Sequence, residues 1–232
     1  MTEDMIRDCM QNLATYYQNI VNVDGSIIKR ELLTRLPLSE HNSDMDSFFE
    51  KLTPKDSITI SLRQIELAAQ IYDKTNIVCS INVDNYAWLN DDLKNLLIDK
   101  CKSFSQPIIL EFTELRPMPP IDEINSVFLE LKRQGVKLAL DDFGTGLNGI
   151  SVFADYDFDI VKIDRKLTLG IEERPQKLKV LSHILDLLNV LDKEHIVEGV
   201  EDRKQFNSLT EIGFINFQGF LFHKPAPIEE LL

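Results

Sequence analysis

The chain has 232 residues, of which 44% are hydrophobic and 27% charged, as expected of a globular protein with a large core. Its net charge of −13, from 25 basic and 38 acidic residues, argues against a basic surface that binds DNA or RNA. No apolar stretch reaches the roughly 18 residues of a membrane span, and the first residues lack signal-peptide order, so we expect a cytoplasmic protein without a membrane partner.

The N-terminal third predicts a helix, a hairpin and a second helix. Residues 1–15 are expected to form the first helix. Residues 16–36 read as two strands around Asp24 and Gly25, a strong turn pair. The apolar periodicity of residues 56–74 predicts the second helix, with Asp56 as its N-cap.

The rest of the chain alternates short apolar runs with amphipathic segments. The runs are residues 76–83, 107–113, 136–142, 159–164, 195–200 and 215–222. Together with the hairpin they make eight strands, which predicts one α/β domain over residues 1–232, a modified TIM (β/α)8 barrel with one antiparallel strand near the N-terminus. An open doubly wound sheet is the alternative, although no glycine-rich phosphate loop opens a helix here.

A polar residue interrupts most of these predicted strands. A barrel directs the side chains at the carboxyl ends of its strands into one mouth, so these groups are expected to meet. They are Glu31, Asn82, Glu111, Asp141, Asp142, Lys162, Glu198 and Gln218.

The five carboxylates of this set favour a metal site. A single acid at a strand end more often faces solvent or caps a helix, but five in one mouth would repel each other strongly without cations. Oxygen ligands without histidine or cysteine suit Mg²⁺ or Mn²⁺, and the number suffices for two ions that share a bridging carboxylate. Two such ions are the usual apparatus for in-line attack on a phosphodiester, although unrelated metal-assisted hydrolysis is a further alternative.

Seven short motifs follow one another in the order of a known family. They are ELLTR (31–35), SINVD (80–84), LEFTE (110–114), DDFGTG (141–146), VKID (161–164), EGVE (198–201) and QGFLFHKPAP (218–227). On these motifs the sequence, over residues 16–232, resembles the EAL-domain cyclic di-GMP phosphodiesterases. The resemblance implies a modified eight-stranded barrel and hydrolysis of cyclic di-GMP to linear pGpG, with no sensor or cyclase domain beside it.

The resemblance also assigns roles to individual residues. The expected ligands of one metal are Glu31, Asn82, Glu111 and Asp141, and those of the second are Asp141, Asp142 and Glu198. The expected catalytic residues are Lys162, which orients the attacking water, Glu198, a candidate general base, and Glu114, which anchors the DDFGTG loop. The positions that match substrate contacts are Gln18, Arg35 and Gln218.

The sequence departs from the family pattern at several points. Leu32 replaces the alanine of the naming motif, and Asn19 replaces a common proline. Residues 36–49 lack the usual His-Pro and glycine-rich stretch, so guanine contacts there are expected to differ. Residues 147–150 replace a Tyr-Ser-Ser-like loop that couples the site to dimerisation in the family.

Two functions follow from the resemblance. The first is a phosphodiesterase that uses two Mg²⁺ or Mn²⁺ ions, is inhibited by Ca²⁺ and forms a homodimer. The second is a non-catalytic EAL protein that acts as a cyclic di-GMP receptor or binds a regulatory protein partner. Turnover of cyclic di-GMP distinguishes the two.

Overall fold

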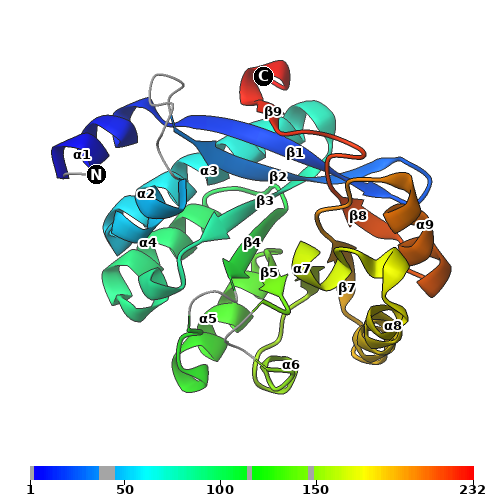
Figure 1. Ribbon diagram of the computed structural model, residues 1–232. Helices are drawn as coiled ribbons and strands as arrows, with labels where there is room; N and C mark the ends of the chain where they lie inside the picture. Colours follow the sequence, from blue (N-terminus) through cyan, green and yellow to red (C-terminus); the bar gives the residue numbers. More distant parts are fainter. Residues whose placement is uncertain (1–2, 37–44, 114–116, 146–148) are drawn as a thin grey trace.

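The computed structural model describes residues 3–36, 45–113, 117–145 and 149–232. Its strands form one sheet that curls into a closed barrel, with helices on the outside (Figure 1). The strands that close the barrel are β1 (Ala14–Asn22), β2 (Ile27–Arg35), β3 (Val78–Val83), β4 (Ile108–Thr113), β5 (Lys137–Phe143), β6 (Ile160–Ile163), β7 (Glu194–Val197) and β8 (Asn216–Gln218). The predicted eight-stranded barrel is confirmed.

The antiparallel strand of this barrel is β1. It pairs antiparallel with β2 and with β8, whereas the strands from β2 to β8 pair in parallel. A short ninth strand, β9 (Ala226–Pro227), adds to β1 and was not predicted. The hairpin turn lies where the sequence predicts it, and Gly25 adopts a left-handed φ of 86° that suits glycine.

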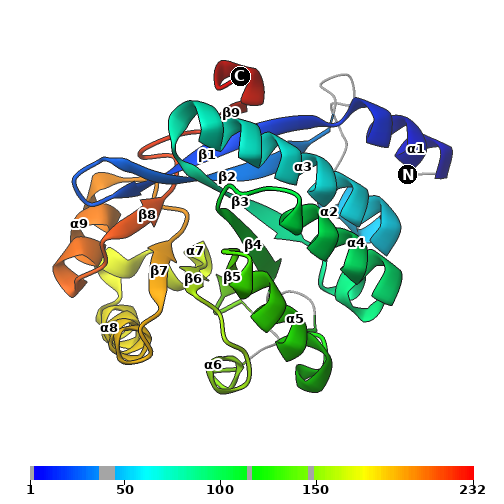
Figure 2. The ribbon, with the colours of Figure 1, turned by 180° about the vertical axis from the view of Figure 1, so that it is seen from behind.

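The helices occupy most of the predicted segments, seen from behind in Figure 2. They are α1 (Glu3–Asn12), α2 (Met45–Lys51), α3 (Pro54–Thr75), α4 (Asp91–Lys102), α5 (Ile121–Arg133), α6 (Val152–Asp155), α7 (Arg165–Thr168), α8 (Pro175–Val190) and α9 (Arg203–Ile212), with short 3₁₀ turns η1 (Asn85–Leu89), η2 (Ile171–Glu173) and η3 (Ile228–Glu230). In the described ranges no helix is long and apolar enough to cross a membrane.

Several predicted boundaries are wrong. Thr53, not Asp56, is the N-cap of α3, and Asp56 completes a reciprocal capping box three residues later. The first helix ends at Asn12, because Ala14 already pairs with Arg35 in the hairpin. The strands predicted at 195–200 and 215–222 are shorter, so Glu198 follows β7 rather than lying within it.

The inside of the barrel has an apolar layer below a polar one. The apolar layer consists of Ile20, Ile109, Ala139, Ile160 and Ile196. Side chains two residues apart on a strand face the same side, so each member is paired with a polar residue nearer the carboxyl ends of the parallel strands. These partners are Gln18, Glu111, Asp141, Lys162 and Glu198, respectively. Gln18 precedes Ile20 because β1 runs in the opposite direction.

Candidate metal centre

Lys162 lies at the centre of the polar layer. Its side chain is 1% exposed, and its Nζ atom lies 2.9 Å from Glu111 Oε2 and 2.9 Å from Glu198 Oε1. The same ammonium is 3.0 Å from Asp141 Oδ1 and 3.3 Å from Glu31 Oε2. Four of the five predicted carboxylates therefore surround one buried cation, and each comes from a different part of the chain.

Amide side chains orient Glu31. Asn82 Nδ2 donates to Glu31 Oε1 at 3.0 Å, and Gln218 Nε2 donates to Glu31 Oε2 at 2.6 Å. Gln218 also donates to Gln18 Oε1 at 3.1 Å, and Gln18 Nε2 donates to the backbone oxygen of His223 at 2.9 Å. This chain of hydrogen bonds fixes the carboxylate from both sides. The sequence did not single out His223.

A bulge brings both aspartates of the DDFGTG motif to the mouth. Consecutive residues of a regular strand face opposite sides, but the pairing of β5 with β6 shifts register between Leu140 and Phe143. Asp142 adopts a φ of 58°, which is unusual for a residue other than glycine. Its carboxylate accepts a hydrogen bond from Thr113 Oγ1 at 3.1 Å. This conformation explains how two adjacent acids reach one site.

Burial and mutual repulsion perturb the acids. Burial raises the pKa of Glu111 to about 8, although the Lys162 charge opposes the shift. Burial, followed by the charge of Asp141, raises the pKa of Asp142 to about 6. The pKa values of Asp141 and Glu198 are also raised, again chiefly by burial.

Glu31 and Lys162 remain charged despite their burial. Burial alone would raise the pKa of Glu31, but Lys162 and the hydrogen bonds from Gln218 and Asn82 lower it overall. Burial alone would lower the pKa of Lys162, but the surrounding carboxylates raise it well above its usual value. One ammonium therefore faces several acids, and neutrality of the site requires further protons or cations.

The donor set fits divalent cations. Two groups of carboxylates have ligand atoms within 4.8 Å of one another: Glu31, Glu111 and Asp141 form one, and Asp141, Asp142 and Glu198 form the other. Asp141 belongs to both, as a bridging ligand would. Its buried Oδ1 atom lacks a hydrogen bond of good geometry to the described residues, although Lys162 Nζ is only 3.0 Å away. Oxygen donors of this kind suit hard ions such as Mg²⁺ or Mn²⁺.

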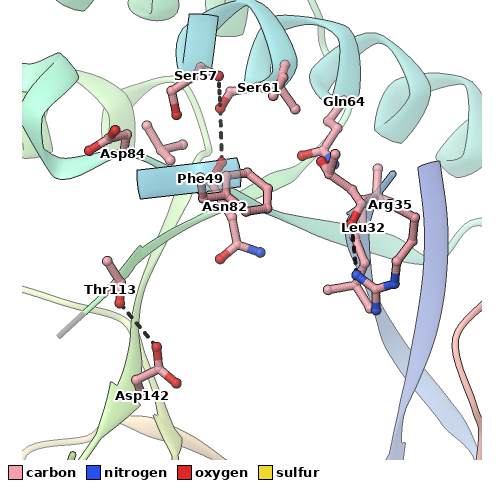
Figure 3. A pocket seen from close by; sticks show the side chains of 14 residues that line it. Leu32, Arg35, Phe49, Ser57, Ser61, Gln64, Asn82, Asp84, Thr113 and Asp142 are labelled. Atoms are coloured by element: carbon pink, nitrogen blue, oxygen red, sulfur yellow. Dashed lines mark hydrogen bonds between the residues drawn. The ribbon is translucent and has the colours of Figure 1, made fainter. Parts of the chain in front are cut away.

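Two cavities flank the centre. One, of about 340 Å³, is lined by residues that include Asn82, Asp142 and Thr113. Figure 3 shows it with Arg35 at one side and Asp142 at the other. The second, of about 270 Å³, is lined by residues that include Glu31, Glu198, Gln18 and Gln218. Arg35 and Leu33 line both cavities, so a guanidinium lies between the two openings.

The structure brings together ten of the eleven predicted site residues. They are Gln18, Glu31, Arg35, Asn82, Glu111, Asp141, Asp142, Lys162, Glu198 and Gln218. Glu114 and part of the loop after Asp142 lie outside the described residues. The predicted absence of disulfides agrees with three free, buried cysteines.

Comparison with known proteins places this barrel in a family. The fold and site together define a closed α/β barrel with an acid-rich candidate metal centre at the carboxyl ends of its strands. The EAL domain model matches residues 3–225, and the chain belongs to the EAL domain family.

Individual relatives agree with this assignment. Cyclic di-GMP phosphodiesterase PdeH of Escherichia coli (strain K12) is 28% identical over 93% of this chain and 84% of its own length. The structure of EAL enzyme Bd1971 with cAMP and cyclic di-GMP bound has a TM-score of 0.85 and 26% identity, over 98% of this chain and 66% of that one.

A further solved structure shares the fold. It is Klebsiella pneumoniae BlrP1 in a manganese and cyclic di-GMP complex, with a TM-score of 0.79 and 24% identity, over 93% of this chain and 56% of that one. The chain spans only 33% to 48% of the length of several other curated relatives that are named as cyclic di-GMP phosphodiesterases.

Proposed function

We propose that the chain is a divalent-metal-dependent phosphodiesterase that hydrolyses cyclic di-GMP to linear pGpG. The observation that carries the proposal is the pair of carboxylate groups that share Asp141 beside the buried Lys162. Family membership supports the substrate, since PdeH is a named cyclic di-GMP phosphodiesterase and Bd1971 and BlrP1 are described with cyclic di-GMP bound.

The site residues divide into those that hold metal and those that act on water. Glu31, Asn82, Glu111 and Asp141 would hold one Mg²⁺ or Mn²⁺ ion, and Asp141, Asp142 and Glu198 the other. When bound, the two ions supply positive charge at the phosphate and acidify a water molecule.

Lys162 and Glu198 then direct the chemistry. The ammonium of Lys162 holds the attacking water by hydrogen bonding, and Glu198, 2.9 Å from Lys162 Nζ, accepts its proton. The water oxygen forms a bond to phosphorus while the bond from phosphorus to the 3′ oxygen breaks. The leaving 3′ oxygen takes up a proton, and the product is a linear dinucleotide with a 5′-phosphate.

The cavities on either side of the centre support a two-base substrate. Cyclic di-GMP has two phosphates and two bases, so a phosphate at the metal centre places parts of the molecule on both sides of it. Arg35, which lines both cavities, can donate a bidentate pair of hydrogen bonds to a phosphate. Gln18 and Gln218 line the second cavity and would contact the substrate there.

The test is an assay of the purified protein with cyclic di-GMP, with Glu31→Ala as the matched variant. We expect linear product with Mn²⁺ or Mg²⁺ and none from the folded variant, since Glu31 belongs to one carboxylate group and accepts hydrogen bonds from two amides. Binding of cyclic di-GMP without turnover would contradict the enzyme and favour a receptor. Near-normal turnover in Glu31→Ala would contradict the assigned centre.

A further inference from the structure

The cavity of about 340 Å³ has an aromatic wall that the metal centre does not explain. Phe49, on α2, lines it together with apolar side chains that include Leu32, Ile60 and Val83. Figure 3 shows the Phe49 ring near Asn82, a predicted metal ligand, within the same opening. A flat apolar ring beside a phosphate site is a surface on which a nucleobase can stack.

Helix α2 presents its two phenylalanines in different directions. Consecutive helix residues are about 100° apart around the axis, so adjacent side chains face different surroundings. Phe48 is fully buried, and its ring lies 5.5 Å from that of Phe49 in an edge-to-face arrangement. Phe49 is only partly buried and lines the cavity.

Phe48 attaches α2 to the N-terminal helix. It forms a small hydrophobic core with Cys9 and Leu13, from the end of α1 and the start of β1, and with Leu52. Phe49 and Ile60 pack against the edge of this core, and both also line the cavity. The position of α1 is therefore linked to the cavity wall through one layer of side chains.

The rest of the wall offers hydrogen-bond acceptors. Gln64 Nε2 donates to Thr34 Oγ1 at 3.1 Å, which leaves the amide oxygen as the atom that a ligand would meet. The carboxylate of Asp84 also lines the cavity. Guanine presents adjacent N–H donors at N1 and at its exocyclic amine, so acceptors around an aromatic surface suit this base.

We propose that this cavity binds one guanine of the dinucleotide, which stacks on Phe49, and that packing of α1 against Phe48 holds the ring in place. The inference rests on the proposed function, since the purine enters as part of the phosphodiester substrate. It assigns the base contact to α2, in the segment where the sequence departs from the family pattern.

The test measures kcat, KM and Mn²⁺ affinity for four variants. Phe49→Ala and Phe49→Leu remove the aromatic face, and Phe49→Tyr keeps it. Phe104→Leu, a partly buried phenylalanine after α4 that is not in this wall, is the matched control. We expect KM for cyclic di-GMP to rise about 10-fold or more in the Ala and Leu variants and to stay near normal in the Tyr variant and the control. Mn²⁺ affinity should not change in any of the four.

The outcomes separate this inference from the proposed function. An inactive wild-type protein that also fails to bind cyclic di-GMP would overturn the function itself. An active wild type with an unchanged KM in Phe49→Ala, or a Leu variant that matches the Tyr variant, would overturn the stacking role alone.

The link to α1 has its own variant. Phe48→Leu loosens the contact with α1 but keeps an apolar side chain, and we expect KM to rise in the same direction as for Phe49→Ala, by a smaller factor. Circular dichroism confirms that α2 and the barrel remain folded. An unchanged KM in a Phe48→Leu protein with reduced stability would overturn the link.

Discussion

At the scale of single residues, Lys162 determines how the acid cluster is neutralised. It contacts carboxylates from four parts of the barrel while its own side chain is 1% exposed. A residue that orients the attacking water acts mainly in the transition state, so its loss lowers kcat more than it raises KM.

Lys162→Met therefore tests this role. We expect kcat for cyclic di-GMP to fall roughly 100-fold or more, with a much smaller change in KM. Lys137→Met, at the exposed start of β5, is the control and should leave both constants unchanged. A variant with normal kcat and a raised KM would instead identify Lys162 as a substrate contact.

The raised pKa of Glu111, about 8, predicts how the metal-free protein responds to pH. A carboxyl whose pKa is higher in the folded state binds more protons there than in the unfolded state, so stability falls as pH rises towards the folded value. We expect the free energy of unfolding in chelator to decrease between pH 6.5 and 8. The buried His195 has a lowered pKa and acts only below this window, where its protonation destabilises the fold.

Denaturant unfolding at pH 6.5 and pH 8 measures this effect. Glu111→Gln removes the titrating carboxyl, and its stability should change less with pH than that of the wild type. Added Mn²⁺ should raise the stability of the wild type more at pH 8 than at pH 6.5, because cations then replace protons. Stability that rises with pH in chelator would show that the acids are not strained in the folded protein.

At the scale of secondary-structure elements, the bulge at the end of β5 positions the centre. Asp142, with a φ of 58°, carries backbone strain that glycine would not. We expect Asp142→Gly to be about 1 kcal/mol more stable to denaturant than Asp142→Asn in chelator, since both lack the charge and only glycine relieves the strain.

Both Asp142 variants should lose most of their hydrolytic activity, because each lacks one carboxylate of the group formed with Asp141 and Glu198. The Asn variant therefore controls for the lost charge, and the difference in stability isolates the backbone. Equal stabilities of the two variants would argue against strain at this position.

The sequence predicts the strands well and their details less well. Apolar runs and their spacing locate eight strands, because buried strands need consecutive apolar residues. The bulge after Leu140 has no comparable signal, since it depends on the pairing of β5 with β6. Asp56 was mistaken for an N-cap because Thr53 and Asp56 are both capping residues, and only the structure shows their reciprocal hydrogen bonds.

At the scale of the whole molecule, the barrel explains why the site residues could be listed before their positions were known. Polar residues that interrupt buried strands converge at the carboxyl ends of a barrel, which correctly brings Glu31, Glu111, Asp141 and Lys162 together. The roles of His223 and Phe49 depend instead on contacts between distant segments. His223 reaches Gln18 from more than 200 residues away, and no local pattern indicates this.

The size of the cation tests the geometry of the whole centre. Mg²⁺ takes six oxygen ligands at roughly 2.0–2.1 Å, whereas Ca²⁺ prefers roughly 2.3–2.6 Å and more ligands. Ca²⁺ is also the weaker Lewis acid. We expect Ca²⁺ to support binding of cyclic di-GMP, measured by calorimetry, but not its hydrolysis. Equal turnover with Ca²⁺ and Mg²⁺ would contradict the proposed spacing of the two ions.

The most direct test of the central claim is the formation of linear pGpG by protein stripped of metal with chelator. The account predicts no product without a divalent cation, and restored turnover when Mg²⁺ or Mn²⁺ is added back. Full activity without a divalent cation, or bound cyclic di-GMP that stays intact with every ion, would contradict it.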